Sequence, residues 1–181
     1  MKILVTGPQG SGKSTQAVLL AQDLGVPYIA AGEIFRNLTL IDDSQKAEKI
    51  RALMSTGELI PIEMADEIIN RRLQYTDCQK GFVLDGFPRN LDQLNKLQVK
   101  LDHIIYINVS DKEGIARLLK RKRADDTEDV IGERLSIYHA ETKPLLAIFK
   151  RENILEEVNG ERPISQIHTD IVKRLKINDI H

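Results

Sequence analysis

The 181-residue chain has almost no cysteine and no long apolar run, and each shortage excludes a class of protein. Cys78 is the single cysteine, so the chain can form neither an internal disulfide nor a four-cysteine zinc site. A membrane-spanning helix needs roughly 18 consecutive apolar residues, and no stretch reaches that length. The apolar start, MKILVTGPQG, meets a Gly/Pro-rich loop too early for a signal peptide. We therefore expect a cytoplasmic protein that does not bind a membrane.

The chain also lacks a net charge that would attract a large polyanion. It has 26 Lys and Arg residues against 27 Asp and Glu residues, a formal net charge of −1. Such a balance creates no field for nucleic acid, so we expect no nucleic-acid partner, and any bound anion must meet locally placed cations. With 41% hydrophobic residues, a chain of this length can bury one core, which predicts a single domain, 1–181.

What the chain does contain is an alternation of strand and helix patterns. Short apolar runs typical of strands buried on both faces occur at 2–6, 81–85 and 103–109, with a weaker one at 154–158. Helical patterns between them include 111–122 and a long one at about 127–151, which Pro144 kinks or restarts. Residues 30 to about 72 show helical patterns and no strand. The alternation predicts an α/β fold with a parallel sheet and helices on both faces.

The segment GPQGSGKST, residues 7–15, carries the strongest chemical signal. A glycine, four residues and then Gly12-Lys13-Ser14 stand between a predicted strand and a predicted helix, which is the context of a P-loop. Glycines let backbone N–H groups curl around an anion, and the helix N-terminus adds positive charge. Lys13 would reach the outer phosphates, while Ser14 or Thr15 would offer a hydroxyl to magnesium or phosphate.

Asp85 ends the second apolar run, at the position where a P-loop protein needs a carboxylate to organise magnesium. It continues into DGFPRN, where Gly86 and Pro88 shape a turn and Arg89 follows. Ligands of α/β sheets usually bind at turns of this kind, beyond the carboxyl ends of the strands. The segment therefore predicts a second part of the site.

Four arginines surround the charged segment at 120–129, namely Arg117, Arg121, Arg123 and Arg134. Arg117 and Arg121 lie one helical turn apart on the same face. Charge runs of this kind usually form a solvated surface. Near a P-loop, however, arginines suit phosphoryl transfer, in which an arginine aimed at the transferring group contributes on the order of 10³–10⁵ in rate.

Five ordered motifs, spread from residue 1 to about 167, resemble the nucleoside monophosphate kinase family and, within it, the adenylate kinases. They are GPQGSGKSTQA, AAGEIFR, GELIP, GFVLDGFPRNLDQ and RADDTEDVIGERLSIYHAETKPL. The resemblance implies a P-loop NTPase fold with a five-stranded parallel sheet and helices on both faces. It also implies a division into a core (1–29, 61–120 and 127–181), a small helical monophosphate-binding subdomain (30–60) and a minimal lid turn (121–126).

The resemblance further implies a reversible transfer of the terminal phosphate of MgATP to AMP, giving two ADP, by a monomer without a covalent intermediate. The implied catalytic residues are Lys13, Arg89, Arg121, Arg123 and Arg134. The implied ATP-binding residues are Gly10, Ser11, Gly12, Lys13, Ser14, Thr15, Arg117, Arg121, Gly160 and Arg162. The implied AMP-binding residues are Ala31, Gly32, Arg36, Glu58, Leu59, Ile60, Gly86, Phe87, Pro88, Arg89 and Gln93. Magnesium would bind mainly through the nucleotide phosphates, with Ser14 and Asp85 as direct or water-mediated supports.

Three departures from the family pattern leave alternatives open. Ala31 stands where adenylate kinases usually carry threonine or serine, and with Glu33 it is more like the UMP/CMP kinases. Gln93 instead aligns with the glutamine that reads adenine, whose donor and acceptor edge an amide can pair. We expect AMP as the acceptor, because a contact with the base edge discriminates directly between bases. A hydroxyl at position 31 would add only one hydrogen bond, of about 0.5–1.5 kcal/mol. The third departure is the lid, in which only Lys122 separates Arg121 from Arg123.

Other functions compete with this interpretation. A UMP/CMP kinase of the same fold is the nearest. A small P-loop kinase acting on a sugar or an acid would leave the DGFPR and AAGEIFR motifs unexplained. A module that senses ATP and AMP without turnover is a third alternative, against which Lys13, Asp85 and the arginines argue.

Overall fold

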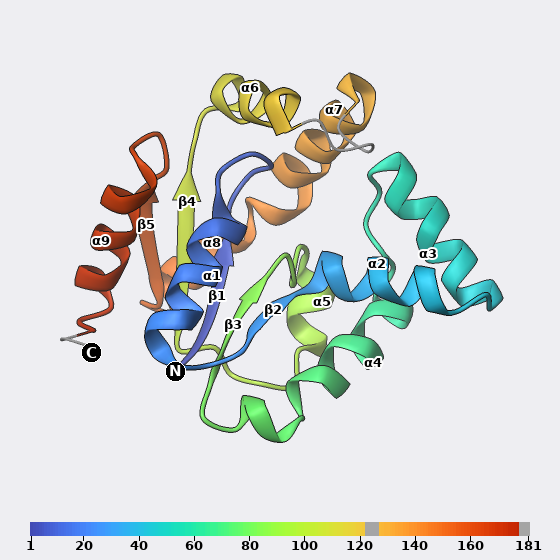
Figure 1. Ribbon diagram of the computed structural model, residues 1–181, viewed down its shortest axis with the longest axis horizontal. Coiled ribbons are helices and arrows are strands. Elements are labelled where there is room, and N and C mark those ends of the chain that lie inside the picture. The colour runs from blue at the N-terminus through green and yellow to red at the C-terminus, as the bar shows by residue number, and fades with distance from the viewer. Residues whose placement is uncertain (122–126, 178–181) are drawn as a thin grey trace.

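The computed structural model describes residues 1–121 and 127–177, and within them five parallel strands form one sheet (Figure 1). The strands are β1 (Lys2–Thr6), β2 (Tyr28–Ala30), β3 (Phe82–Asp85), β4 (His103–Asn108) and β5 (Leu155–Asn159). Their order across the sheet is β2-β3-β1-β4-β5. The predicted α/β fold is confirmed, and each of the four apolar runs matches a strand to within one residue at each end. The segment at 30–72 forms helices and their connecting turns apart from its first residue, Ala30, which ends β2; this strand was not located in the sequence.

The sheet is apolar on both faces because alternate strand residues enter two separate cores. Ile3 and Val5 of β1 pack against α1 (Lys13–Leu24) and α9 (Ile164–Arg174). Leu4, between them, belongs to the opposite core, which contains residues of α4 (Ile62–Leu73), α5 (Leu91–Lys96) and α8 (Leu145–Arg151). Helices thus cover both faces, as predicted, and because all the strands are parallel their carboxyl ends lie at one edge of the sheet.

Two helices extend away from the sheet on the side of β2 and lie to the right in Figure 1. They are α2 (Ala31–Ile41) and α3 (Gln45–Thr56). The Ser44 side chain caps α3 by accepting a hydrogen bond from the Ala47 backbone N–H, and α3 ends at Gly57, whose φ is 88°. These helices lie within the predicted 30–60 segment and form one wall of the site described below.

Two further helices lie beyond the carboxyl ends of the strands, at the top of Figure 1. They are α6 (Asp111–Arg121) and α7 (Glu128–Ile137). The predicted helix at 127–151 is not continuous, because a π-helical turn at Tyr138–Thr142 follows α7 and α8 begins after Pro144. The restart predicted at Pro144 is confirmed, since α8 begins at the next residue. Proline has no backbone N–H to continue the preceding helix. None of the helices in these described ranges is long and apolar enough to span a membrane.

Candidate active site

The loop between β1 and α1 has the backbone of a phosphate-binding loop. Gly10 and Gly12 adopt φ angles of 79° and 85°, in the left-handed region that side chains disfavour. Gly12 is the N-cap of α1, so the positive end of this helix faces the loop. The loop also touches α6, since a β-carbon on Gly10 would lie 2.2 Å from the Gly114 carbonyl oxygen. This contact places the helix that carries Arg117 and Arg121 directly against the loop.

A cavity of about 180 Å³ opens beside this loop and contains most of the predicted monophosphate-binding residues. Its walls come from α1, the β3 end, α2 and the segment after α3. Of the predicted residues, those that line it are Lys13, Ser14, Ala31, Gly32, Arg36, Glu58, Leu59, Ile60, Asp85, Gly86, Phe87, Arg89, Gln93, Arg121 and Arg134. Pro88 lines a smaller neighbouring cavity with Lys13. Residues far apart in the chain therefore line one cavity.

Lys13 lies among positive charges at the floor of this cavity. Its Nζ donates to the Pro8 carbonyl oxygen at 3.2 Å. Burial lowers the pKa of Lys13 to about 8; Asp85 opposes the shift, while Arg89, Arg121 and Arg134 add to it. A bound phosphate would add negative charge beside this group of cations.

Asp85 lies at the end of β3, and its side chain is only 6% exposed. Its Oδ2 accepts hydrogen bonds from the Ser14 hydroxyl at 2.5 Å and from the Tyr28 hydroxyl at 3.1 Å. Its Oδ1 is buried and has no hydrogen-bond partner within the described part of the chain. A carboxylate and a hydroxyl are hard oxygen ligands, so this orphaned oxygen fits a magnesium ion or a water bound to it. Tyr28 was missed by the sequence reasoning, because no motif includes it.

Arg89 is held at three points by different parts of the fold. Its Nε donates to the Gly86 carbonyl at 2.8 Å, and its backbone N–H donates to Gln93 Oε1 at 2.8 Å. Its carbonyl accepts from the Thr142 hydroxyl at 2.7 Å. Burial lowers the pKa of Arg89, with nearby Arg134 and Arg36 acting in the same direction against Asp85. Thr142, in the π-helical turn, is a second residue that sequence reasoning missed.

Gln93 lies in the wall of the cavity and is 3% exposed. Besides accepting from Arg89, it donates from Nε2 to the Ile60 carbonyl at 3.2 Å. An amide has two acceptor lone pairs and two donor hydrogens, so half of its capacity is left for a ligand. Gln93 thus connects the arginine turn to the segment that follows α3.

Three of the predicted ATP-binding residues, Arg117, Gly160 and Arg162, lie outside the main cavity. Arg117 donates from Nη1 to the Gly160 carbonyl at 3.0 Å and from Nε to Glu113 at 2.7 Å, so the structure brings Arg117 and Gly160 together. The Arg162 guanidinium instead binds the Asn159 carbonyl at 3.2 Å and Asp170 at 2.6 Å.

The predicted lid arginines occupy different positions. Arg121, at the end of α6, is exposed and lines the cavity. Arg134 of α7 is half-buried and donates to the Met54 carbonyl at 3.5 Å, which connects α7 to α3. Arg123, and with it most of the predicted 121–126 lid, lies outside the described residues.

Comparison with known proteins gives one consistent family. The sequence model described as "Adenylate kinase" matches residues 5–154. "Adenylate kinase 1" from Synechocystis sp. is 37% identical over 181 residues, which cover 96% of each chain. "Adenylate kinase" from Thermobifida fusca is 36% identical over 187 residues, covering 97% of this chain and 98% of the relative. "Adenylate kinase" from Bifidobacterium longum is also 36% identical, covering 97% and 100%. The similarity thus extends over almost the whole chain.

Proposed function

The chain belongs to the adenylate kinase family, and we propose that the basic side chains around its main cavity orient ATP and AMP for direct phosphate transfer. The enzyme transfers the terminal phosphate of ATP to AMP in a reversible reaction that gives two ADP. The observation that carries the proposed roles is the convergence on one cavity of five basic residues: Lys13, Arg36, Arg89, Arg121 and Arg134.

Each group of residues has a distinct part in this proposal. The 10–15 loop binds the ATP phosphates through its N–H groups, and Lys13 binds the outer phosphates. Arg36 and Arg89 bind the phosphate of AMP, which their planar guanidinium groups match. An AMP phosphate oxygen then attacks the terminal phosphorus of ATP, and the bond to the leaving ADP oxygen breaks. Arg121 and Arg134, with Arg123 as a further prediction, stabilise the charge on the transferring group.

Enzymes of this family take ATP as its magnesium complex. We place the magnesium mainly on the nucleotide phosphates, with Asp85 and Ser14 supporting it directly or through water. The buried Asp85 Oδ1 without a protein partner supports this assignment. When bound, magnesium neutralises charge that develops between the two outer phosphates. Ser14, Asp85 and Lys13 line the same cavity, so Ser14 and Asp85 would hold the ion near the phosphates that Lys13 binds.

The base of AMP would contact the wall formed by Leu59, Ile60 and Gln93. Gln93 retains one lone pair and one N–H for the adenine edge, and its other two interactions hold the wall in place. Ala31 lines the cavity without a polar side-chain atom, so AMP selection would depend on the amide. The monomeric state, the cytoplasmic location and the division at residues 30–60 and 121–126 stay predictions.

A parallel assay tests the acceptor and the reaction together. Purified protein is given MgATP with AMP, CMP, UMP, GMP or shikimate, and nucleoside diphosphate or ADP formation is measured. We expect ADP formation to be fastest with AMP. Rapid turnover of CMP or UMP with little turnover of AMP would contradict the acceptor assignment. Binding of ATP without turnover of any acceptor would support a sensing module instead.

A further inference from the structure

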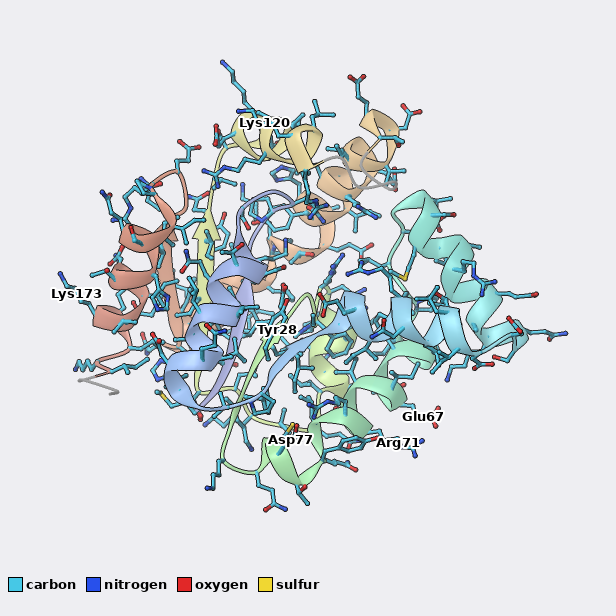
Figure 2. All side chains as sticks on the ribbon, in the orientation of Figure 1. Tyr28, Glu67, Arg71, Asp77, Lys120 and Lys173 are labelled. Carbon is cyan, nitrogen blue, oxygen red and sulfur yellow. The ribbon has the colours of Figure 1, made fainter. Side chains whose placement is uncertain are left out.

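Tyr28 is a half-buried tyrosine at the outer edge of the sheet, on the three-residue strand β2. Its ring packs against the core under α1, and its neighbour across the strands is Val83 of β3. In Figure 2, Tyr28 lies near the centre of the view beside α1, whereas Lys173 points outward at the periphery. The residue also lines the main cavity. It therefore has an apolar ring in the core and a hydroxyl at the site.

The hydroxyl of Tyr28 meets the carboxylate that the proposed function assigns to magnesium. Tyr28 donates to Asp85 Oδ2 at 3.1 Å, and Ser14 donates to the same oxygen at 2.5 Å. The other oxygen, Oδ1, is buried and has no partner in the chain as described. Two donors on one oxygen fix the rotation of the carboxylate and leave the other oxygen for a ligand. The two donors come from different elements, α1 and β2, so the orientation does not depend on the P-loop alone.

We propose that Tyr28 is a positioning residue, which holds Asp85 in the orientation that supports the magnesium of MgATP. This inference rests on the proposed role of Asp85. The phenol is suited to the task because its ring is held in the core under α1 while its hydroxyl donates to Asp85 Oδ2. Ser14 would also offer its oxygen to the metal, whereas the proposed role of Tyr28 is confined to its hydrogen bond with Asp85.

A purely structural role for Tyr28 makes a different prediction. The ring alone would fill the space under α1, and phenylalanine would fill it equally well. A positioning role requires the oxygen. Tyr28→Phe therefore separates the two roles, because it removes the donor and keeps the packing.

The chain offers a matched control in Tyr106. Its hydroxyl donates to Asn108 Oδ1 at 3.1 Å and accepts from the Tyr138 hydroxyl at 3.2 Å, and the residue is 7% exposed. Tyr106 does not line the main cavity. Tyr106→Phe thus removes a buried tyrosine hydroxyl without touching Asp85.

The experiment measures how much magnesium strengthens nucleotide binding. Calorimetry gives the affinity for a non-hydrolysable ATP analogue in saturating magnesium and in EDTA, and the ratio of the two is the magnesium effect. We expect Tyr28→Phe to lower this ratio by about 3- to 10-fold, because Asp85 keeps Ser14 but loses its second donor. The affinity in EDTA should change by less than about 2-fold. Tyr106→Phe should leave the ratio unchanged.

A double-mutant cycle tests whether Tyr28 acts through Asp85. In an Asp85→Asn background, Tyr28→Phe should lower the magnesium effect no further, since the group it positions is already altered. An independent, additive loss in that background would overturn the proposal. So would an unchanged ratio in the single variant, or an equal loss of affinity in magnesium and in EDTA. Absence of turnover in the wild-type protein would instead refute the proposed function, and is measured separately.

Discussion

In the proposed site, the two ends of the cavity would bind phosphate with different groups, the backbone at one end and side chains at the other. At the P-loop end the backbone itself forms the site, and Gly10 and Gly12 hold φ angles that fix it within one short segment. At the monophosphate end, side chains form the site, and distant elements hold them. Arg89 depends on Gln93, four residues away, and on Thr142, 53 residues away. A site made of backbone is thus specified locally, whereas a site made of side chains is specified by the whole fold.

We expect the largest effect from removing the Lys13 side chain at the P-loop end. Lys13→Ala should lower kcat by about 10³-fold, because a positive charge in a water-poor cavity acts on charge that develops in the transition state. Circular dichroism should show an intact fold. The exposed Lys112 on α6 provides a matched control, and Lys112→Ala should turn over normally. Wild-type activity of Lys13→Ala would remove the P-loop argument.

A second change separates the two ends by acting on packing alone. A β-carbon on Gly114 would lie 2.6 Å from the Gln9 carbonyl oxygen, so Gly114→Ala should push α6 off the P-loop. Because α6 carries Arg117 and Arg121, kcat/KM for ATP should fall by about 10- to 100-fold, with KM for AMP changing little. Steady-state kinetics with each substrate varied checks this expectation.

Gly132 provides the control for this packing argument. A β-carbon there would meet nothing within 4 Å, and the residue lies inside α7. Gly132→Ala should leave the kinetics unchanged and stabilise the protein by about 0.5–1 kcal/mol, measured by urea denaturation. Equal losses for ATP and AMP in Gly114→Ala would mean that α6 does not serve the ATP end alone.

At the monophosphate end, Gln93→Asn should have a smaller and more selective effect. The shorter side chain cannot reach both the Arg89 N–H and the Ile60 carbonyl, so it loses at least one hydrogen bond. We expect KM for AMP to rise about 10-fold, the equivalent of about 1.4 kcal/mol, and preference to shift toward CMP and UMP. Competition assays between AMP and CMP measure the shift. An unchanged preference would mean that another residue reads the base.

The smallest expected effect comes from restoring a hydroxyl at position 31. Ala31 lines the cavity at the start of α2, and Ala31→Ser adds one hydrogen-bonding group there. KM for AMP should fall by about 2- to 5-fold, while KM for ATP stays the same. A rise in KM for AMP would show that the hydroxyl is not used by this substrate.

The same contrast explains which features the sequence could predict. The P-loop, the strand that ends at Asp85 and the α/β fold follow from local spacing and apolar periodicity. The strand β2 is only three residues long, and it exists because it pairs with β3. Tyr28 and Thr142 meet their partners across 57 and 53 residues, and no spacing along the chain records such contacts. The arginines of the monophosphate end were found through the family resemblance.

The burial of Lys13, to which the arginines around it add, couples the enzyme to protons. With a pKa of about 8 in the folded protein against an ordinary value of 10.5, Lys13 is neutral above pH 8 in the free enzyme and charged in the unfolded chain up to about pH 10.5. Between these pH values the unfolded chain binds one more proton than the folded protein. The free energy of unfolding therefore increases as the pH rises through this range, because the cost of burying the charged lysine is relieved. A bound phosphate reverses the preference, because it favours the ammonium form. Nucleotide binding in mildly alkaline solution should therefore take up a proton from the buffer. Dissociation of the nucleotide should release that proton again.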